Sequence, residues 1–432
     1  MRFNLPTFLA AFGLAVTGLT ITGTLASAFA PPLAAQVQLS GPSGNIGMPP
    51  VSGVLGDVRD RVSGTLDSLD ARALDEARSL LRARERFLDW LVRRNRDTIE
   101  RDGAGNLARR GELVAIALGD SARLALSGAG FTILSSERIE GLDIAVTRLA
   151  VPEGLELGEA QALASALVPN VEIAPDSLHF QAGVPAAASA AVQMAAQGAA
   201  ANGTVVGMID GAPGAAVPVE VERGFAAGAP MPSDHGTAVA SLLRGEGVSR
   251  IKVADVYGRD PAGGNALAIA RALGWLASSG ADVITISLVG PRNALVERAV
   301  GAVRARGIVV VAAVGNDGPA APPAFPASYD GVVAVTGADR RGRALIEAGR
   351  ALHLDYAAPG ERVFALDRRG TLKSWRGTSF ATPLVAARIA AAMGRGGNWR
   401  ARLDAEARDL GARGPDPVFG RGLVCEPCAR KR

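Results

Sequence analysis

The stretch that most directly indicates the fold is residues 205–210, which read Val-Val-Gly-Met-Ile-Asp. An apolar run that ends in an acid is typical of a buried parallel strand with a carboxylate at its carboxyl end. Two more stretches follow along the chain, Asp-His-Gly-Thr-Ala-Val-Ala at 234–240 and Gly-Thr-Ser-Phe-Ala-Thr-Pro at 377–383. Each leads into an apolar, helix-like segment, so we expect its histidine or serine to stand at a helix N-terminus.

Asp210, His235 and Ser379 are therefore candidates for a nucleophilic triad. In this interpretation Ser379 attacks a carbonyl carbon, His235 takes the proton of the hydroxyl and later returns it, and Asp210 holds the imidazole in the required tautomer. Each residue alone has an ordinary alternative: Asp210 as a strand-end cap, His235 as a surface residue and Ser379 as a helix N-cap. The catalytic interpretation depends on the three motifs occurring together.

These stretches resemble the motifs of the subtilase (subtilisin-like) serine peptidase family, whose triad runs in the order Asp, His, Ser. The resemblance extends from about Gly203 to Val424 and includes residues 309–318, Val-Val-Val-Ala-Ala-Val-Gly-Asn-Asp-Gly. It implies that Asn316 binds the oxyanion together with the backbone N–H of Ser379. It also implies serine endopeptidase activity and a doubly wound α/β catalytic domain with a mostly parallel sheet.

The resemblance further implies a substrate-binding strand and a specificity pocket (S1). The strand pairs with the substrate backbone as an added strand, and the pocket lies between this strand and a second segment. The residues implied for the two walls are Ser287, Leu288, Val289 and Gly290 on the strand, and Ala313, Val314 and Gly315 opposite. The family usually has glycine where Val289 stands, so we expect a narrowed pocket entrance or a reshaped neighbouring subsite, and a small or medium apolar residue before the cleaved bond. Thr378 is interpreted either as a second oxyanion donor or as a helix cap.

Residues 1–28 are typical of an export signal. Arg2 supplies a positive charge, residues 9–25 are apolar, and Ala26-Ser27-Ala28 is a small-residue cleavage site. The alternative is an uncleaved segment that anchors the protein, because the apolar stretch approaches the length that spans a membrane. We therefore expect an exported protein, periplasmic or extracellular, which contacts the membrane only if this segment stays uncleaved.

The rest of the chain divides by composition and pattern. Residues 29–61 are a flexible spacer rich in Gly, Pro and Ser, and residues 62–103 form a charged amphipathic helix. Residues 111–180 follow the order β-α-β-β-α-β, which predicts a small split βαβ (ferredoxin-like) domain. Residues 181–202 are an Ala-rich linker and the expected processing region, and 203–428 form the catalytic domain.

The predicted domain at 111–180 resembles in layout the propeptide domains that precede many subtilase catalytic domains. The resemblance implies that this prodomain inhibits the enzyme within a precursor that cuts itself. An unrelated accessory domain is the alternative. The cut is expected anywhere from about His179 to Gly203.

The composition limits the possible partners. The chain has 432 residues, enough for two domains, and 46 Lys plus Arg against 42 Asp plus Glu. This small excess, with no basic patch that interleaves aromatics, argues against a nucleic-acid partner. The cysteines Cys425 and Cys428 are expected to form a local disulfide in an exported protein. We expect no metal or other cofactor, since residues 244–250 after the catalytic histidine offer too few oxygen ligands for calcium.

Two other functions stay open at this point. A non-catalytic protein can use the subtilase fold to bind peptides, and an esterase-like acyl hydrolase can use the same site because the tetrahedral chemistry is shared. The complete set of Asp210, His235, Ser379 and Asn316 argues against the first. We expect the substrates to be peptides or proteins.

Overall fold

The computed structural model describes residues 75–182, 184–185 and 203–425. The predicted export signal, the predicted spacer and the first part of the predicted charged helix lie outside the described residues. All described residues belong to one compact unit.

A seven-stranded sheet forms the centre of residues 203–425. In spatial order its strands are β15 (Tyr356–Pro359), β14 (Val333–Ala338), β13 (Val309–Ala313), β11 (Val283–Ile286), β8 (Val205–Asp210), β10 (Arg250–Asp255) and β9 (Val221–Gly224). Every neighbouring pair is parallel, which confirms the predicted parallel sheet. Because β8 is an inner strand, its last residue, Asp210, lies at the carboxyl edge with a strand on either side.

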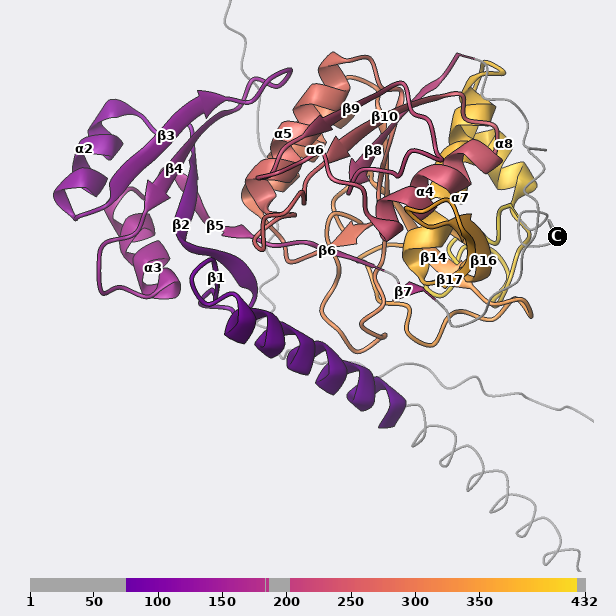
Figure 1. The fold of residues 1–432 in the computed structure, drawn as a ribbon, viewed down its shortest axis with the longest axis horizontal. Helices are drawn as coiled ribbons and strands as arrows, with labels where there is room; N and C mark the ends of the chain where they lie inside the picture. The colour runs from indigo at the N-terminus through magenta and orange to yellow at the C-terminus, as the bar shows by residue number, and fades with distance from the viewer. Residues whose placement is uncertain (1–74, 183, 186–202, 426–432) are drawn as a thin grey trace, which may run out of the picture. The chain divides into compact units, whose positions relative to one another are not determined.

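Helices cover both faces of this sheet (Figure 1). Successive side chains of a strand point to opposite faces, so Ile209 and Met208 belong to different cores. Ile209 packs with α5 (Ala266–Ser278) and α6 (Ala294–Arg304). Met208 packs with a second group of helices. These are α4 (Asp234–Gly245), α7 (Thr378–Met393) and α8 (Trp399–Glu406). The fold is therefore doubly wound, as predicted.

A second, smaller sheet lies in the N-terminal part of the described chain. Its elements are β2 (Leu107–Ile116), α2 (Asp120–Gly128), β3 (Thr132–Arg138), β4 (Ala145–Ala150), α3 (Leu157–Leu167) and β5 (Glu172–Ser177). The strands pair antiparallel, with β4 between β2 and β3, and β5 on the other side of β2. This is the element order that the sequence predicted for residues 111–180, and the pairing is that of a split βαβ unit.

The helix predicted over residues 62–103 ends earlier than expected. Residues 75–94 are helical, and β1 (Ile99–Arg101) follows. The Asn95 side chain donates to the carbonyl of Leu91 at 3.0 Å, and Ile99 is fully buried and pairs with Arg109 of β2. The prediction was wrong for residues 95–103 because pairing with β2, a tertiary contact, outweighs the local charged pattern.

The small sheet packs on the N-terminal ends of α5 and α6. A carboxylate oxygen of Asp176 accepts from the backbone N–H of Leu267 at 3.0 Å, and the Asn293 amide donates to the carbonyl of Pro175 at 2.9 Å. The backbones also meet closely, because a Cβ atom placed on Gly274 would lie 2.1 Å from the carbonyl oxygen of Glu140. The two hydrogen bonds join the small sheet to the N-terminal ends of α5 and α6, where backbone N–H groups lack partners within the helix. Together with the close approach at Gly274, they form one interface between the small sheet and these helices.

Candidate active site

The three predicted catalytic residues stand at a strand end and at two helix starts. Asp210 is the last residue of β8, and His235 is the second residue of α4. Ser233 caps α4 by accepting from the N–H of Gly236 at 2.9 Å, which fixes the first turn of this helix. Ser379 is the second residue of α7, which begins after Gly377. The backbone of Gly377 has φ 136°, a value that favours glycine.

Asp210 and His235 are in direct contact. The Nδ1 atom of His235 lies 2.9 Å from Oδ2 and 3.0 Å from Oδ1 of Asp210. The aspartate is fully buried and the histidine is 6% exposed, so water does not compete for this contact. With Nδ1 facing the carboxylate, Nε2 is the nitrogen that can exchange a proton, and it has no hydrogen-bond partner among the described residues.

The hydroxyl of Ser379 faces a different partner in this structure. It donates to the carbonyl oxygen of Ser287 at 3.0 Å, and the Ser287 hydroxyl donates to the carbonyl of Ser379 at 2.9 Å. The structure therefore joins two of the three predicted triad members by hydrogen bonds, whereas the third is hydrogen-bonded to Ser287. A turn of the Ser379 side chain about its Cα–Cβ bond is needed before Nε2 of His235 can receive its proton.

Asn316 has a free donor in a buried position. Its Oδ1 atom accepts from the N–H of Thr378 at 3.0 Å, which orients the amide. Its Nδ2 atom is buried without a hydrogen-bond partner among the described residues. The Thr378 hydroxyl donates to the carbonyl of Gly315 at 3.2 Å and so does not point to an oxyanion here. A buried, oriented N–H group without a partner suits the binding of a developing negative charge.

The chain's own residues 180–182 and 184–185 lie along this site. Strand β6 (Phe180–Gln181) pairs antiparallel with β12 (Leu288–Val289), and β7 (Val184–Pro185) pairs antiparallel with β17 (Leu372–Arg376). The predicted linker over 181–202 therefore begins as strand, and its later residues, 186–202, lie outside the described residues.

Ala182 makes two backbone hydrogen bonds at the centre of the site. Its N–H donates to the carbonyl of Ser287 at 3.2 Å, and its carbonyl accepts from the N–H of Ser379 at 3.0 Å. The side chain of the preceding residue, Gln181, donates to Oδ1 of Asp210 at 2.9 Å. Sequence analysis did not identify Gln181 or Ala182, because nothing in the Ala-rich segment marks them as residues that enter a site.

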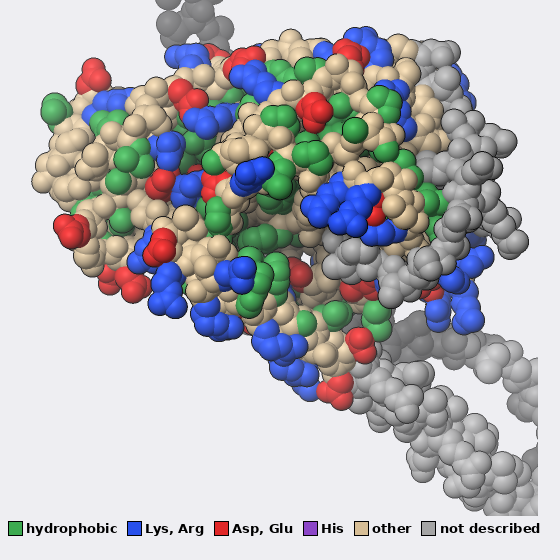
Figure 2. All heavy atoms as spheres, in the orientation of Figure 1, with side chains coloured by type: hydrophobic (Ala, Val, Ile, Leu, Met, Phe, Trp, Pro, Cys, Tyr) green, Lys and Arg blue, Asp and Glu red, His purple; other side chains and the backbone are tan. Residues whose placement is uncertain are grey.

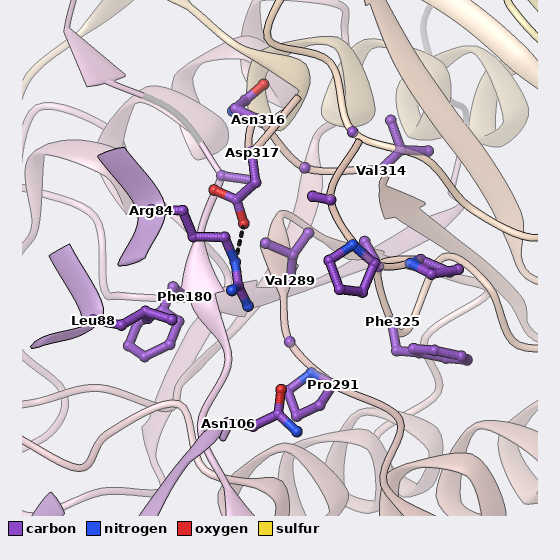
Figure 3. Close-up of a pocket in the computed structure, with 18 of the residues that line it drawn as sticks. Arg84, Leu88, Asn106, Phe180, Val289, Pro291, Val314, Asn316, Asp317 and Phe325 are labelled. Atoms are coloured by element: carbon purple, nitrogen blue, oxygen red, sulfur yellow. Dashed lines mark hydrogen bonds and ion pairs between the residues drawn. The ribbon is translucent and has the colours of Figure 1, made fainter. Parts of the chain in front are cut away.

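A pocket of about 800 Å³ lies beside residues 180–182. One side is formed by β12 and the loop after it, and the other by residues 314–317 and 321–325. Helical residues 75–94 contribute Arg84, whose Nε lies 3.1 Å from an Asp317 carboxylate oxygen. Figure 3 shows Val289 projecting into this pocket near Arg84 and Asp317, with Val314 on the opposite side. Six of the predicted substrate-binding residues border the pocket or pair with residues 180–182; Ala313 ends β13 just before Val314.

Two buried ionisable side chains lie next to the segment in the cleft. Burial lowers the pKa of His179 to about 4, and the Tyr257 hydroxyl donates to its carbonyl at 2.8 Å. Burial raises the pKa of Asp176 to about 6, although the positive charge of Arg109 acts in the opposite direction. Both shifts favour the uncharged side chain, as expected where water is excluded.

Comparison with known proteins now identifies the family. The model of the subtilase family matches residues 226–410. Subtilisin BL of Lederbergia lenta is 32% identical over 219 residues, which cover 46% of this chain and 80% of that protein. The chain belongs to the subtilase family. Thermitase of Thermoactinomyces vulgaris is also 32% identical, over 193 residues that cover 44% of this subtilase and 67% of thermitase.

The comparisons agree with the fold and with the enzyme class. Fervidolysin from Fervidobacterium pennivorans, described as a keratinolytic enzyme related to subtilisin, has a similar structure with a TM-score of 0.61 and 16% identity. The similarity covers 77% of this chain and 62% of fervidolysin, and it shows the fold alone. The subtilase is a serine-type endopeptidase. The match to the family model begins at residue 226 and does not include Asp210, which lies 2.9 Å from Nδ1 of His235.

Two predictions about the ends of the chain are not tested by these observations. Cys425 is buried, whereas Cys428 lies outside the described residues, so the disulfide stays a prediction. Within residues 75–182, 184–185 and 203–425, no helix has the length and apolar character needed to cross a bilayer. The predicted export signal is outside this part of the chain.

Proposed function

We propose that this subtilase is an exported endopeptidase made as a precursor that processes itself with Asp210, His235 and Ser379. The observation that carries the proposal is the hydrogen bond from the N–H of Ser379 to the carbonyl of Ala182, 3.0 Å long. It holds a carbonyl of the chain's own N-terminal region beside the residue that attacks carbonyls in serine peptidases. The precursor is therefore arranged as an enzyme with a substrate already bound.

In the proposed chemistry, Ser379, His235 and Asp210 have the same roles in the formation of the acyl-enzyme and in its hydrolysis. The Ser379 oxygen attacks the carbonyl carbon, while Nε2 of His235 takes the hydroxyl proton and Asp210 stabilises the resulting imidazolium. The tetrahedral oxyanion is bound by the N–H of Ser379 and the amide of Asn316. Loss of one such donor typically reduces turnover by about 10²–10³. His235 then gives its proton to the leaving amine, and a water molecule hydrolyses the acyl-enzyme by the same route.

The same geometry supports inhibition by residues 99–182 after the cut. These residues keep their contacts with α5 and α6 through Asp176 and Pro175. Residues 180–181 remain paired with β12, where a substrate would otherwise bind. A segment that fills the cleft and is held by a folded domain competes with other peptides at high effective concentration. We therefore assign this region the role of an intramolecular inhibitor.

Intact mass of the exported protein tests the proposal. We expect wild type to be a fragment that begins after the described N-terminal sheet, and Ser379→Ala to retain that sheet. The two chains differ by one oxygen atom. Equal circular dichroism of the two proteins before processing would exclude a fold defect in Ser379→Ala. Equal trimming of both proteins, or none in either, would contradict self-processing.

A further inference from the structure

We propose that the bond cut first in the precursor is the one after Ala182, and that Val289 restricts the specificity pocket to residues about the size of alanine. This inference rests on the proposed function and deepens it, because it names the bond and the class of substrate. It is carried by the register of residues 180–181 and 184–185 and by the position of one side chain in the pocket.

The register selects a single carbonyl for attack. The chain is bound as a strand on both sides of the site, at residues 180–181 by β12 and at residues 184–185 by β17. Between them, the Ala182 carbonyl accepts from the N–H of Ser379, and Ala182 borders the same pocket as Asn316, whose Nδ2 is buried without a partner among the described residues. Oxyanion donors act on the carbonyl of the residue before the cleaved bond. Ala182 is therefore that residue.

Nearby carbonyls are engaged elsewhere. The His179 carbonyl accepts from the Tyr257 hydroxyl, and residues Phe180 and Gln181 pair in register with Val289 and Leu288. The Gln181 side chain is also fixed by its hydrogen bond to Asp210. A shift of the chain by one residue would break all of these contacts, because the side-chain period of a strand is two.

The step balances as an ordinary acyl transfer. A bond forms between the Ser379 oxygen and the Ala182 carbonyl carbon, and the hydroxyl proton passes to Nε2 of His235. The bond from this carbon to the nitrogen of residue 183 then breaks, and that nitrogen takes the proton. Water next adds to the acyl carbon, losing a proton to His235, and Ser379 leaves and regains it. The products are a carboxylate on Ala182 and an amine on Gly183.

Val289 explains why alanine stands at this position. Its side chain projects into the pocket (Figure 3), which Gly315 also lines. A Cβ atom placed on Gly315 would lie only 3.3 Å from a Val289 methyl carbon, so the valine methyl groups leave no room for a side chain at residue 315. Ala182 borders the same pocket and is 4% exposed. A larger side chain before the cleaved bond has to displace the valine methyl groups, which in a packed site typically reduces the rate about 10- to 200-fold.

The test uses the full-length precursor and short peptides. In a time course of the wild-type precursor, the first product is expected to begin at Gly183. Ala182→Phe is expected to slow its formation at least about tenfold, and Val289→Gly combined with Ala182→Phe to restore it. Rescue by a second substitution distinguishes a pocket effect from a folding defect. A first product with another N-terminus, or no slowing by Ala182→Phe, would overturn the inference.

Peptides separate this inference from the proposed function. The processed enzyme is assayed with His-Phe-Gln-Ala-Gly-Val-Pro and with the same peptide carrying Phe in place of Ala. We expect wild type to prefer the Ala peptide at least about tenfold in kcat/KM, and Val289→Gly to reduce this ratio about tenfold or more. Because the ratio is taken within one enzyme, active-site concentration cancels. Equal cleavage of both peptides by wild type would refute the pocket assignment while the proposed function stands, and cleavage of neither would refute both.

Discussion

Individual residues in the site are set by contacts that no local pattern contains. Asn316 lies in the sequence Gly-Asn-Asp-Gly. Its Oδ1 accepts from the N–H of Thr378, and this tertiary contact leaves Nδ2 without a partner among the described residues, so that it can donate to an oxyanion. Thr378 had two interpretations from sequence, and its hydroxyl donates to Gly315 instead of pointing to an oxyanion. His179 is the clearest case, because the same contacts that bury it also make it sensitive to pH.

The pH effect of His179 has a definite sign. Its pKa is lowered from 6.5 to about 4 by burial, and its ring nitrogens have no hydrogen-bond partner among the described residues. Between about pH 6.5 and 4 the unfolded chain therefore binds more protons at this residue than the folded chain. The stability that neutral His179 contributes is complete above pH 6.5 and is lost as the pH falls. Asp176, whose pKa is raised from 3.8 to about 6, acts in the opposite direction over an overlapping range.

A pair of uncleavable precursors isolates this contribution. Ser379→Ala and the double variant Ser379→Ala/His179→Leu both retain Asp176, Arg109 and Arg148, so the effects of these groups cancel in the difference between the two proteins. We expect the double variant to gain on the order of 3 kcal/mol in free energy of unfolding, relative to Ser379→Ala, between pH 7 and pH 4. Denaturant unfolding at several pH values measures it. A difference that stays constant with pH would show that His179 does not titrate in this way.

At the scale of elements, helical residues 75–94 add a contact to the cleft beyond the small sheet. Their outward side chains include the exposed residues Arg82, Arg86 and Arg93, and Figure 2 shows Lys and Arg side chains along this helix. Their inward side chains reach the active-site loops. Arg84 pairs with Asp317 at 3.1 Å, and the Phe87 ring meets Phe180 edge-on with centroids 6.1 Å apart. The helix therefore stabilises the segment that occupies the cleft.

Arg84→Ala should weaken this hold by a small amount. The pair is partly exposed, and such ion pairs contribute about 0.2–1 kcal/mol, so we expect the self-processed complex to release its prodomain up to about fivefold faster. The rate at which peptidase activity appears after dilution measures release. Arg82→Ala is the matched control, since it removes the same charge from the outer side of the helix. Higher salt should reduce the difference between the two variants, and equal acceleration by both would exclude a specific role for the pair.

At the scale of the whole molecule, Gly141 and Gly274 allow the backbones of the small sheet and of the catalytic domain to approach closely. Gly141 has φ 71° and approaches the carbonyl of Gly274 on α5, where its Cβ would lie 2.3 Å away. The charged pair Arg298–Glu172 and the contacts of Asp176 and Asn293 join the same two parts of the chain. Gly274 has no local reason to be glycine, whereas the positive φ of Gly141 also favours glycine locally. Each is needed because two parts of the chain that are far apart in sequence come together here.

Gly274→Ala is expected to loosen the interface without damaging the catalytic domain alone. The atoms that a Cβ at residue 274 would meet belong to Ile139 and Glu140, so the processed enzyme has room for it once the prodomain has left. We expect release of the prodomain more than about tenfold faster, because the backbone of residues 139–140 has to move. Gly301→Ala in α6 is the control, as a Cβ there meets nothing within 4 Å and improves helix propensity by up to about 1 kcal/mol. Similar release rates for both variants would argue against the interface.

Much of this protein could be read from its sequence because local rules act over short distances. The buried strand at 205–210, the helix starts at His235 and Ser379, and the split βαβ order all follow from periodicity and capping. The tertiary structure alone decided the early end of the helix at residue 94, the pairing of residues 180–181 with β12 and of residues 184–185 with β17, and the position of Val289 beside Gly315. These depend on hydrogen bonds and packing between segments separated by many residues. The local sequence does not predict which distant segment pairs with a strand edge or forms the opposite wall of a pocket.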